Sequence, residues 1–546
     1  MKHFTFLSMA AIALACSMQA SAQTMTVTTD VMDPATEGSL VKIIADAPAG
    51  KHIDIEFNFD GTELVYKMGK AMEIKGKDIT INGVNKKNGK KVTMSAPMFM
   101  GTDGKETASP LFNVTTDGKL ALKNVEITGC RKIVMYCQDN GVLNISDSRF
   151  YENRDIKATG GNNGGVLRHS GGTVTIERSV FEKNEGNGGY GGGAICTYNT
   201  ENKACSMTMR ACTFKENTSA TSGGAYAVNL RNNNTVPTVL IENCTFAGNF
   251  VSDRGGAIYM QDAHAPAKND KAFSPVLVNN TFVGNASGKE KEDTGGAINF
   301  WARSSAVIMT PILFNNLFAS NHLAVFNETE DHMSDIRCFY LDGDTSGETV
   351  LTQTVKPSVA NNLFCGTENK FYSVYGSKNN NGKVDFEKDP IFLEKTDNLL
   401  GGDEPDEIHF TAKLYSDLCI AAIAKNSVAI GKGVASFEGI NAPATDQYGN
   451  KRPAKPAVGA AEYTEDTATG VNTVAAAATD KAQLFLANGA IVATGFEGAA
   501  TLDVVNVAGQ WMFSATVTNG QQVAVDALPA GVYVARMNGA SVKFVK

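Results

Sequence analysis

The chain has 546 residues, of which 43% are hydrophobic, and a formal net charge of −8. A chain of this length and composition can bury a large core, and it is too long for one compact globule unless it forms a repeat or a solenoid. Its lysine and arginine residues are scattered without a basic run, which argues against nucleic acid as a partner.

Residues 1–22 have the pattern of a secretion signal. A charged start precedes an apolar run from Phe4 to Ala15, and the small residues Ala20 and Ala22 form a cleavage site before Gln23. We therefore expect an exported protein. The alternative is a lipoprotein signal that ends at Cys16, although Ala13 stands where a large aliphatic residue is usual. The sequence has no later apolar run of about 18 residues, so no membrane-spanning helix is predicted.

The cysteine pattern argues against a disulfide framework and against a metal site. Of ten cysteines, Cys16 is lost with the signal, and the odd number that remains excludes a fully paired set. The sequence lacks a Cys-x-x-Cys pair, so zinc has little support. We predict neither a metal nor a cofactor.

The first mature segment predicts a cap followed by strands. Residues 37–46 (EGSLVKIIAD) have Leu40, Ile43 and Ile44 on one helical face. Alternating stretches at 53–59, 72–84, 111–129 and 141–150 then read as strands. An amphipathic helix before such a series is suited to cover the open end of a stack of strands.

A repeat built on Phe-x-x-Asn organises the middle of the chain. Aligned on its phenylalanine, it runs through Phe150, Phe181, Phe214, Phe246, Phe282, Phe318 and Phe364. The steps lengthen from 31 residues (Phe150 to Phe181) to 46 (Phe318 to Phe364). Periods of 20 to 50 residues indicate a solenoid or an array of repeats.

Fixed columns of like residues in the repeat predict structural ladders. Three residues after each phenylalanine stand Asn153, Asn184, Asn217, Asn249, Asn285 and Asn321, and two before it stand Ser148, Ser179, Cys212, Cys244, Asn280, Asn316 and Asn362. In a parallel β-helix each coil lies about 4.8 Å above the last, so stacked amides bond to one another and phenylalanines stack. We interpret these asparagines as a ladder rather than as ligand binders, and Cys212 and Cys244 as packed thiols.

The recurring Gly-Gly-Ala of the repeat carries a family resemblance. The Gly-Gly-Ala motif begins at Gly192, Gly223, Gly255 and Gly295. Together with Phe-x-x-Asn, it resembles the repeat of chlamydial polymorphic outer-membrane proteins and, more broadly, the pectate-lyase-like right-handed β-helix. The resemblance implies an all-β fold, a right-handed single-stranded parallel β-helix with an N-terminal cap over residues 23–463.

The end of this region resembles the closing module of choice-of-anchor surface proteins. The matching segments are residues 384–393, 427–433, 446–453 and 458–463, and the resemblance implies that the β-helix ends there. Arg452, between Asp446 and Glu462, is predicted to form a structural ion pair rather than a ligand site.

The last segments predict a separate domain. A polar, alanine-rich linker at 464–481 precedes residues 482–546. Within these residues, the segments 504–510, 528–537 and 542–546 resemble the type A C-terminal sorting domain of the type IX secretion system of Bacteroidetes. The resemblance implies a small β-sandwich-like domain, the type IX secretion machinery as a partner, and a protein that is secreted to the outer-membrane surface or the extracellular space.

No catalytic residue emerges from the sequence. The paired aspartates and Gly-His-Gly of polygalacturonases do not occur, and Asp147, Asp253 and Asp262 occupy different places in the repeat instead of the calcium cluster of pectate lyases. The histidines His169, His264 and His322 also fall in different columns. An adhesin or binding protein is our main interpretation. The alternatives are a polysaccharide lyase or glycoside hydrolase acting on an acidic polysaccharide, with calcium only for the lyase, and a passive surface spacer.

The best candidate ligand face is the strand after each Gly-Gly pair. Its outward positions hold Arg168, Tyr198, Asn229, Arg231, Tyr259, Gln261, Asn299, Trp301 and Arg303. Exposed aromatic rings beside amides and guanidiniums suit a sugar, so we expect a glycan or a host-surface molecule as ligand. The stretched repeat at 327–377 is a second place where an insertion would shape a binding cleft.

Overall fold

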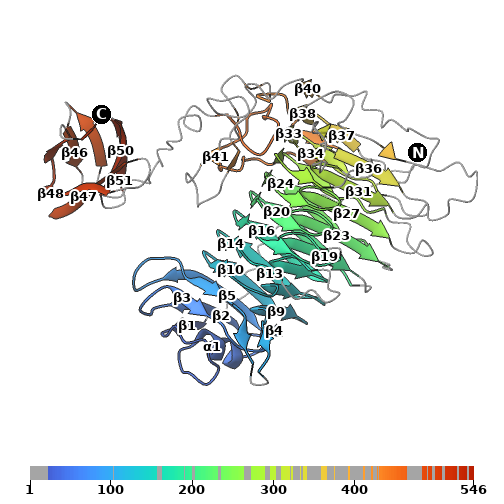
Figure 1. Cartoon of the computed structure of the whole chain (residues 1–546), viewed down its shortest axis with the longest axis horizontal. Helices are drawn as coiled ribbons and strands as arrows, with labels where there is room; N and C mark the ends of the chain where they lie inside the picture. Colours follow the sequence, from blue (N-terminus) through green and yellow to red (C-terminus); the bar gives the residue numbers. More distant parts are fainter. Residues whose placement is uncertain are drawn as a thin grey trace, which may run out of the picture. The chain divides into compact units, whose positions relative to one another are not determined.

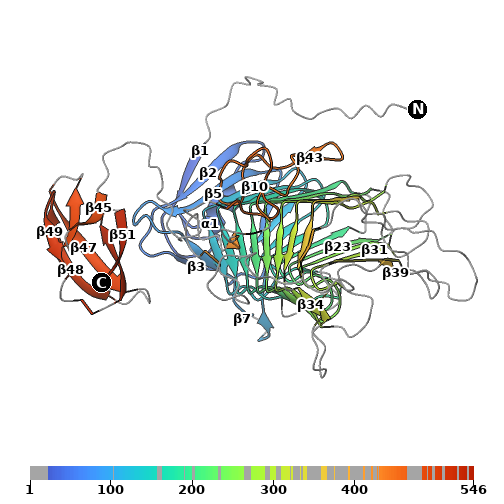
Figure 2. The same ribbon diagram turned by 90° about the horizontal axis from the view of Figure 1, so that it is seen from above.

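The structure is a computed structural model (Figures 1 and 2). It describes residues 23–463 and 483–546, apart from gaps at 102–103, 156–162, 190, 200–202, 232–234, 264–271, 289–294, 303–308, 320, 324–331, 334–335, 341–357, 366–373, 376–390, 394–409, 412–419, 422, 424–426, 428, 488–489, 495–497, 507–510, 526–527, 530 and 538–539. The predicted signal, the linker and most of the stretched repeat at 327–377 therefore lie outside the described residues. The chain divides into two compact units, residues 1–471 and 472–546.

Three long parallel sheets form the first unit, and each coil contributes one strand to each sheet. Sheet A contains β1 (Gln23–Val27), β2 (His52–Phe57), β5 (Asp78–Asn85), β10 (Lys119–Lys123), β13 (Val142–Ser146), β16 (Gly172–Glu177), β20 (Cys205–Arg210), β24 (Thr238–Glu242), β28 (Val276–Val278), β32 (Ile312–Phe314) and β37 (Ser358–Ala360). Sheet B contains β3 (Glu63–Val65), β6 (Thr93–Ser95), β11 (Glu126–Thr128), β14 (Arg149–Tyr151), β17 (Val180–Glu182), β21 (Thr213–Lys215), β25 (Thr245–Ala247), β29 (Thr281–Val283), β33 (Leu317–Ala319), β38 (Leu363–Cys365) and β40 (Ile391–Leu393).

Sheet C closes the cross-section, and a narrower sheet D precedes it in the later coils. Sheet C contains β4 (Met72–Lys75), β9 (Phe112–Thr115), β12 (Met135–Cys137), β15 (Leu167–His169), β19 (Ile195–Asn199), β23 (Tyr226–Arg231), β27 (Ile258–Ala263), β31 (Ile298–Ala302), β36 (Ile336–Tyr340) and β39 (Val374–Tyr375). Sheet D contains β18 (Glu185–Gly186), β22 (Thr218–Ser219), β26 (Phe250–Val251), β30 (Ala286–Ser287), β34 (His322–Leu323) and the antiparallel β35 (His332–Met333). Short hairpins pair β7 (Phe99–Met100) with β8 (Glu106–Thr107), β41 (Phe410–Thr411) with β42 (Ile420–Ala421), and β43 (Ser436–Phe437) with β44 (Ile440–Asn441).

In sheets A, B and C, neighbouring strands come from successive coils, as the colour order in Figure 1 shows. The strands pair in parallel, and equivalent residues stay opposite one another, for example Phe181 beside Phe214 and Phe214 beside Phe246. This arrangement is a parallel β-helix, so the predicted fold class is confirmed.

The second unit is an antiparallel sandwich with its own core. One sheet consists of β45 (Gln483–Ala487), β46 (Ala490–Thr494) and β49 (Gln522–Ala524). The other consists of β47 (Ala499–Asn506), β48 (Trp511–Thr518), β50 (Val532–Met537) and β51 (Ala540–Val545). Buried residues of both sheets, among them Ile491, Val504, Ala535 and Phe544, form one cluster.

A short helix covers the first-coil end of the β-helix. Helix α1 (Leu40–Asp46) begins after Ser39, whose hydroxyl accepts a hydrogen bond from the Lys42 backbone N–H at 3.1 Å. The cap explains why the helix begins three residues later than the predicted start at 37. Leu40, Ile43 and Ile44 are buried in the same cluster as the first strands, so the helix packs its apolar face on the first coil (Figure 1).

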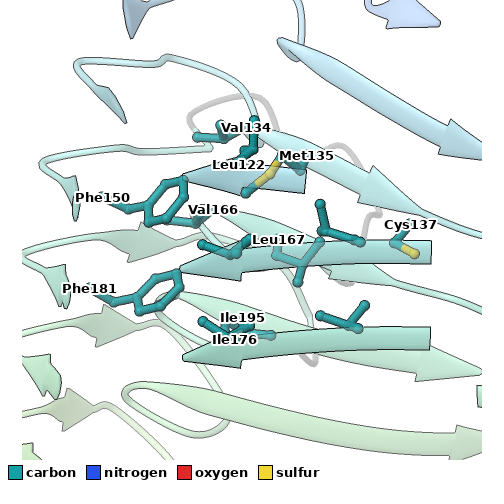
Figure 3. Close-up of a cluster of buried hydrophobic side chains, with 14 of the residues drawn as sticks. Leu122, Val134, Met135, Cys137, Phe150, Val166, Leu167, Ile176, Phe181 and Ile195 are labelled. Carbon is teal, nitrogen blue, oxygen red and sulfur yellow. The ribbon is translucent and has the colours of Figure 1, made fainter. Parts of the chain in front are cut away.

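The phenylalanine column is a continuous stack. Ring centroids from Phe150 to Phe318 lie 4.8–5.0 Å apart, and the ring planes are nearly parallel. Figure 3 shows Phe150 and Phe181 stacked beside the aliphatic side chains of the same coils. The coil repeat sets this spacing, because each coil adds one strand to each parallel sheet.

The asparagine column forms the predicted amide ladder. From Asn153 to Asn285, each Nδ2 donates to the Oδ1 of the asparagine one coil further on, as from Asn184 to Asn217 at 3.0 Å, and also to a backbone oxygen of the preceding coil. All six side chains are fully buried. In the second column, the Cys212 N–H donates to the Cys244 sulfur at 3.4 Å, and both are free thiols as predicted.

Residues 427–463, the closing segment, follow the last coils in sequence but run back along the side of the β-helix. Hydrogen bonds join Asn361 to Lys432 and Asn315 to Val434, near the last coils. Gln447 then bonds the backbone of Cys212, several coils earlier. The expectation that these residues end the helix therefore needs correction, because they lie along the corner between sheets A and B. We call this segment the strap.

Helices among the described residues are all too short or too polar to cross a membrane.

Candidate functional site

The residues predicted to form the ligand face belong to sheet C, except Arg303, which lies outside the described residues. Between the outward positions, Leu167, Ile195 and Ile258 point into the core. Strand register groups the outward residues into two rows, one through Arg168, Cys196, Ala227, Tyr259 and Asn299 and the other through Tyr198, Asn229, Gln261 and Trp301. The Arg231 side chain also lies outside the described residues.

Five of these residues are buried, which contradicts the expected exposure. Asn229, Tyr259, Gln261 and Asn299 have no exposed surface, and Trp301 is 7% exposed. Trp301 packs against the Tyr259 ring, with centroids 6.3 Å apart, and beneath the Arg254 guanidinium, 4.5 Å from its ring. Together with Ala227 the two rings form a small apolar cluster outside the main core. Alternation along a strand fixes which side a residue faces, but not whether that side is covered.

The accessible part of this face lies in earlier coils. Arg168 and Tyr198 are half-buried, and the Arg168 guanidinium lies 5.4 Å from the Tyr198 ring centroid. Tyr136 stands beside Arg168 on the preceding coil, and Asn113 stands beside Tyr136. These four residues and Gln138, which follows β12, make up a surface that we call the Arg168 patch.

Sequence reasoning missed Asn113, Tyr136 and Gln138. The strands β9 and β12 precede the first Gly-Gly pair, and the outward positions were assigned only on strands that follow such a pair. The alternation of β12, in which Met135 and Cys137 are buried and Tyr136 is half-buried, was the available signal.

Hydrogen bonds fix three side chains of the Arg168 patch, those of Asn113, Gln138 and Arg168. The Asn113 Nδ2 donates to Glu73 Oε2, and the Gln138 Nε2 donates to Asn113 Oδ1, each at 2.8 Å. The Arg168 Nε donates to Ser170 Oγ at 3.1 Å, and its Nη1 to Asn163 Oδ1 at 3.3 Å. The patch therefore presents amides and a guanidinium in fixed positions.

A buried carboxylate lies behind the patch. Asp155 has no exposed surface and accepts a hydrogen bond from the Asn163 Nδ2 at 2.8 Å. Burial raises the pKa of Tyr136, and the negative charge of Asp155 adds to that shift. The Tyr136 phenol is therefore a protonated hydrogen-bond donor at neutral pH.

Arg452 forms the predicted structural ion pair within the strap. Its guanidinium binds the Glu462 carboxylate and donates to Asn243 Oδ1 at 2.8 Å. Burial lowers the pKa of Arg452 and raises the pKa of Asp446, whose carboxylate accepts from the Glu462 N–H. These contacts attach the strap to a coil corner.

A histidine and a thiol meet inside the β-helix. The Cys205 sulfur lies 3.3 Å from His169 Nε2. Burial raises the pKa of the Cys205 thiol and lowers the pKa of His169 to about 4. Both groups are neutral at pH 7, so this pair lacks the ion-pair chemistry of a nucleophilic cysteine. Of the other two histidines compared by repeat column, His264 lies outside the described residues, as does the His322 side chain.

Among the described residues, histidine, cysteine, aspartate and glutamate side chains do not gather in a group of three suited to a metal ion.

Comparison with known proteins identifies one repeat. A family model described as the Chlamydia polymorphic membrane protein repeat matches residues 243–261. These residues contain Phe246, Asn249 and the Gly-Gly-Ala-Ile word at Gly255, so the resemblance of the repeat is confirmed. Curated proteins yielded no match to the chain.

Proposed function

We propose that this is a surface-displayed adhesin that binds a glycan through the Arg168 patch. The observation that carries the proposal is a group of half-buried side chains on successive coils: Tyr136 lies beside Arg168, hydrogen bonds hold Arg168, and its guanidinium lies 5.4 Å from the Tyr198 ring centroid. The matched surface-protein repeat supports display outside the cell.

The chemistry of the patch suits a sugar ring. Tyrosine rings offer apolar faces to the C–H groups of a sugar, and their hydroxyls donate hydrogen bonds. The guanidinium and the two amides supply fixed donors and acceptors for sugar hydroxyls or a carboxylate. Few of these groups need to be ordered on binding, because Arg168, Asn113 and Gln138 already have intramolecular partners.

A glycan array followed by affinity measurements tests the proposal. Arg168→Ala is expected to weaken binding of a retained glycan roughly tenfold or more. The matched control is Arg149→Ala on sheet B, where Arg149 lies 4.4 Å from the Tyr151 ring in the same kind of pair. Failure to retain any glycan, or equal losses in both variants, would contradict the proposal.

A turnover assay separates the alternative functions. Residues 24–463 are incubated with acidic polysaccharides, with and without calcium, and products with unsaturated ends or new reducing ends are measured. We expect no turnover. Robust product formation would favour a polysaccharide lyase or a glycoside hydrolase, whereas neither binding nor turnover would favour a passive spacer.

We also propose that residues 1–22 direct export and that residues 482–546 are the type IX sorting domain. The support is the sequence pattern at both ends. Deletion of residues 482–546 in a host with that secretion system should leave the protein in the periplasm. Surface labelling of intact cells would contradict the proposal if the truncated protein still reached the surface.

A further inference from the structure

A hollow of about 690 Å³ opens at the corner where the chain passes from sheet C to sheet A, next to Gln138 of the Arg168 patch. It is lined by Asp139, Asn140, Gly172, Thr173, Lys203, Ala204, Cys205, Ser206, Thr235, Val236 and Thr238. These residues come from successive coils, so the hollow extends along the axis of the β-helix.

Unequal corner lengths create the hollow. Between β15 and β16 the corner consists of residues 170–171 alone, whereas residues 138–141 form the corner before it, and the described residues 203–204 and 235–237 belong to longer corners after it. Gly172 has a positive φ of 80°, and a Cβ there would lie 2.1 Å from the Gly141 carbonyl oxygen. Glycine is therefore required for the short corner, which leaves a notch between longer ones.

Hydroxyl groups line this notch in register. Thr173 pairs with Ser206, and Ser206 pairs with Thr238, at the outward positions where three strands of sheet A begin. Thr173 and Thr238 are exposed and Ser206 is half-buried. Their spacing follows the coil repeat of about 4.8 Å. The three hydroxyls thus form a ladder parallel to the helix axis.

The two charges of the hollow neutralise each other. The Lys203 ammonium lies 2.6 Å from Asp139 Oδ1, and Thr115 and Thr116 donate to the other carboxylate oxygen. The Lys203 ammonium holds the pKa of the Asp139 carboxyl well below its usual range. Lys203 is fixed in turn, because its carbonyl accepts hydrogen bonds from Asn199 and Thr235.

We propose that this hollow binds a neutral, extended oligosaccharide laid along the helix axis. The coil repeat is close to the length of one hexose in an extended glycan, so each hydroxyl of the ladder meets one sugar residue. Repeated hydroxyls match a ligand that itself repeats hydroxyls, and the mutually paired charges leave no net charge to attract an acidic sugar. The proposal rests on the hydroxyl ladder and not on the side chains of the Arg168 patch.

The test is titration calorimetry of the full chain with cellohexaose and mannohexaose, with hexagalacturonate as the acidic comparison. Replacing the three hydroxyl residues together, Thr173→Ala, Ser206→Ala and Thr238→Ala, is expected to weaken binding of a neutral hexasaccharide roughly tenfold. The matched control, Thr175→Ala with Thr208→Ala, changes outward residues two positions further along β16 and β20 and should leave affinity unchanged.

Three outcomes would overturn the proposal. They are the absence of binding by any neutral hexasaccharide, equal losses in the triple variant and the control, and preferential binding of hexagalacturonate. Arg168→Ala distinguishes the two sites, because it should weaken binding at the Arg168 patch roughly tenfold or more and leave the affinity of the hydroxyl ladder unchanged. Circular dichroism of each variant confirms that the β-helix remains folded.

Discussion

Asparagine serves two purposes at the coil corners. In the buried ladder its amide bonds to the copy in the next coil, as Asn217 does to Asn249. Three residues before Phe246, Phe282 and Phe318, the residues Asn243, Asn279 and Asn315 adopt positive φ values of 51–55°, which asparagine tolerates better than most residues. The side chains of this second group reach outward and bond the strap.

Replacement of a central ladder residue tests the first purpose. Asn217→Ala removes hydrogen bonds to Asn184, Asn249 and the Phe181 carbonyl and leaves buried partners unsatisfied. We expect the free energy of unfolding to fall by about 3 kcal/mol, measured by urea denaturation. Asn144→Ala, at an exposed outward position of β13, should change it by less than about 0.5 kcal/mol. Similar losses in both variants would show that the ladder contributes little.

His169 makes stability depend on pH. Its pKa is lowered from 6.5 to about 4 by burial, so the unfolded chain binds the proton more readily than the folded chain does. Stability should therefore decrease as the pH falls from 6.5 towards 4, by roughly 3 kcal/mol in total. The unfolding midpoint of His169→Gln should vary less over this range. Equal pH slopes in the two proteins would contradict the assignment.

The strap explains a change in composition along the repeat. Directly after the phenylalanine, the outward column begins with Tyr151, Glu182 and Lys215 and continues with Ala247, Val283 and Ala319. The latter three are fully or almost fully buried, and they cluster with Ala457 and Val458 of the strap. An outward column of sheet B turns apolar where the strap covers it, because the strap removes that surface from water.

Loss of the ion pair should release the strap. Arg452→Ala leaves Glu462 buried without its cation, and a broken buried pair costs about 3 to 5 kcal/mol. We expect faster hydrogen exchange in residues 427–463 by mass spectrometry, with the coils before β17 unchanged. Lys451→Ala, at the exposed neighbouring cation, should exchange like the unaltered protein. Unchanged exchange in Arg452→Ala would contradict the role of the pair.

At the scale of the whole molecule, the two units have separate cores. The main cluster contains residues from Val27 to Phe318, and the C-terminal cluster contains residues from Ile491 to Phe544. Each unit buries its own apolar surface, and surface burial is the main source of folding stability. The units should therefore unfold independently.

Calorimetry of the chain and of its body tests this independence. The full chain should show two unfolding transitions, and residues 23–463 alone should keep the transition temperature of the larger unit within about 2 °C. The C-terminal residues 472–546 alone should reproduce the other transition. A single cooperative transition, or a large fall in the melting temperature of the isolated body, would show that the units stabilise each other.

Periodic features were predictable because each coil repeats the same physical constraints. The phenylalanine stack, the amide ladder and the packed thiols Cys212 and Cys244 follow from equal residues at equal places, and a strand alternation gives the facing of each side chain. The cap helix followed likewise from the spacing of Leu40, Ile43 and Ile44. Contacts within a coil, or between one coil and the next, therefore belong to the sequence pattern.

Contacts between distant segments were decided by the tertiary structure alone. Burial of Trp301 and Tyr259 depends on what packs over an outward face, and alternation contains no information about that. The path of the strap depends on Asn243 meeting Arg452, which lies far along the chain. The hollow lined by Asp139 and Lys203 likewise forms only because corners of different length lie on neighbouring coils. Sequence by itself determined the solenoid and its ladders, and the tertiary structure decided which surfaces remain free to bind.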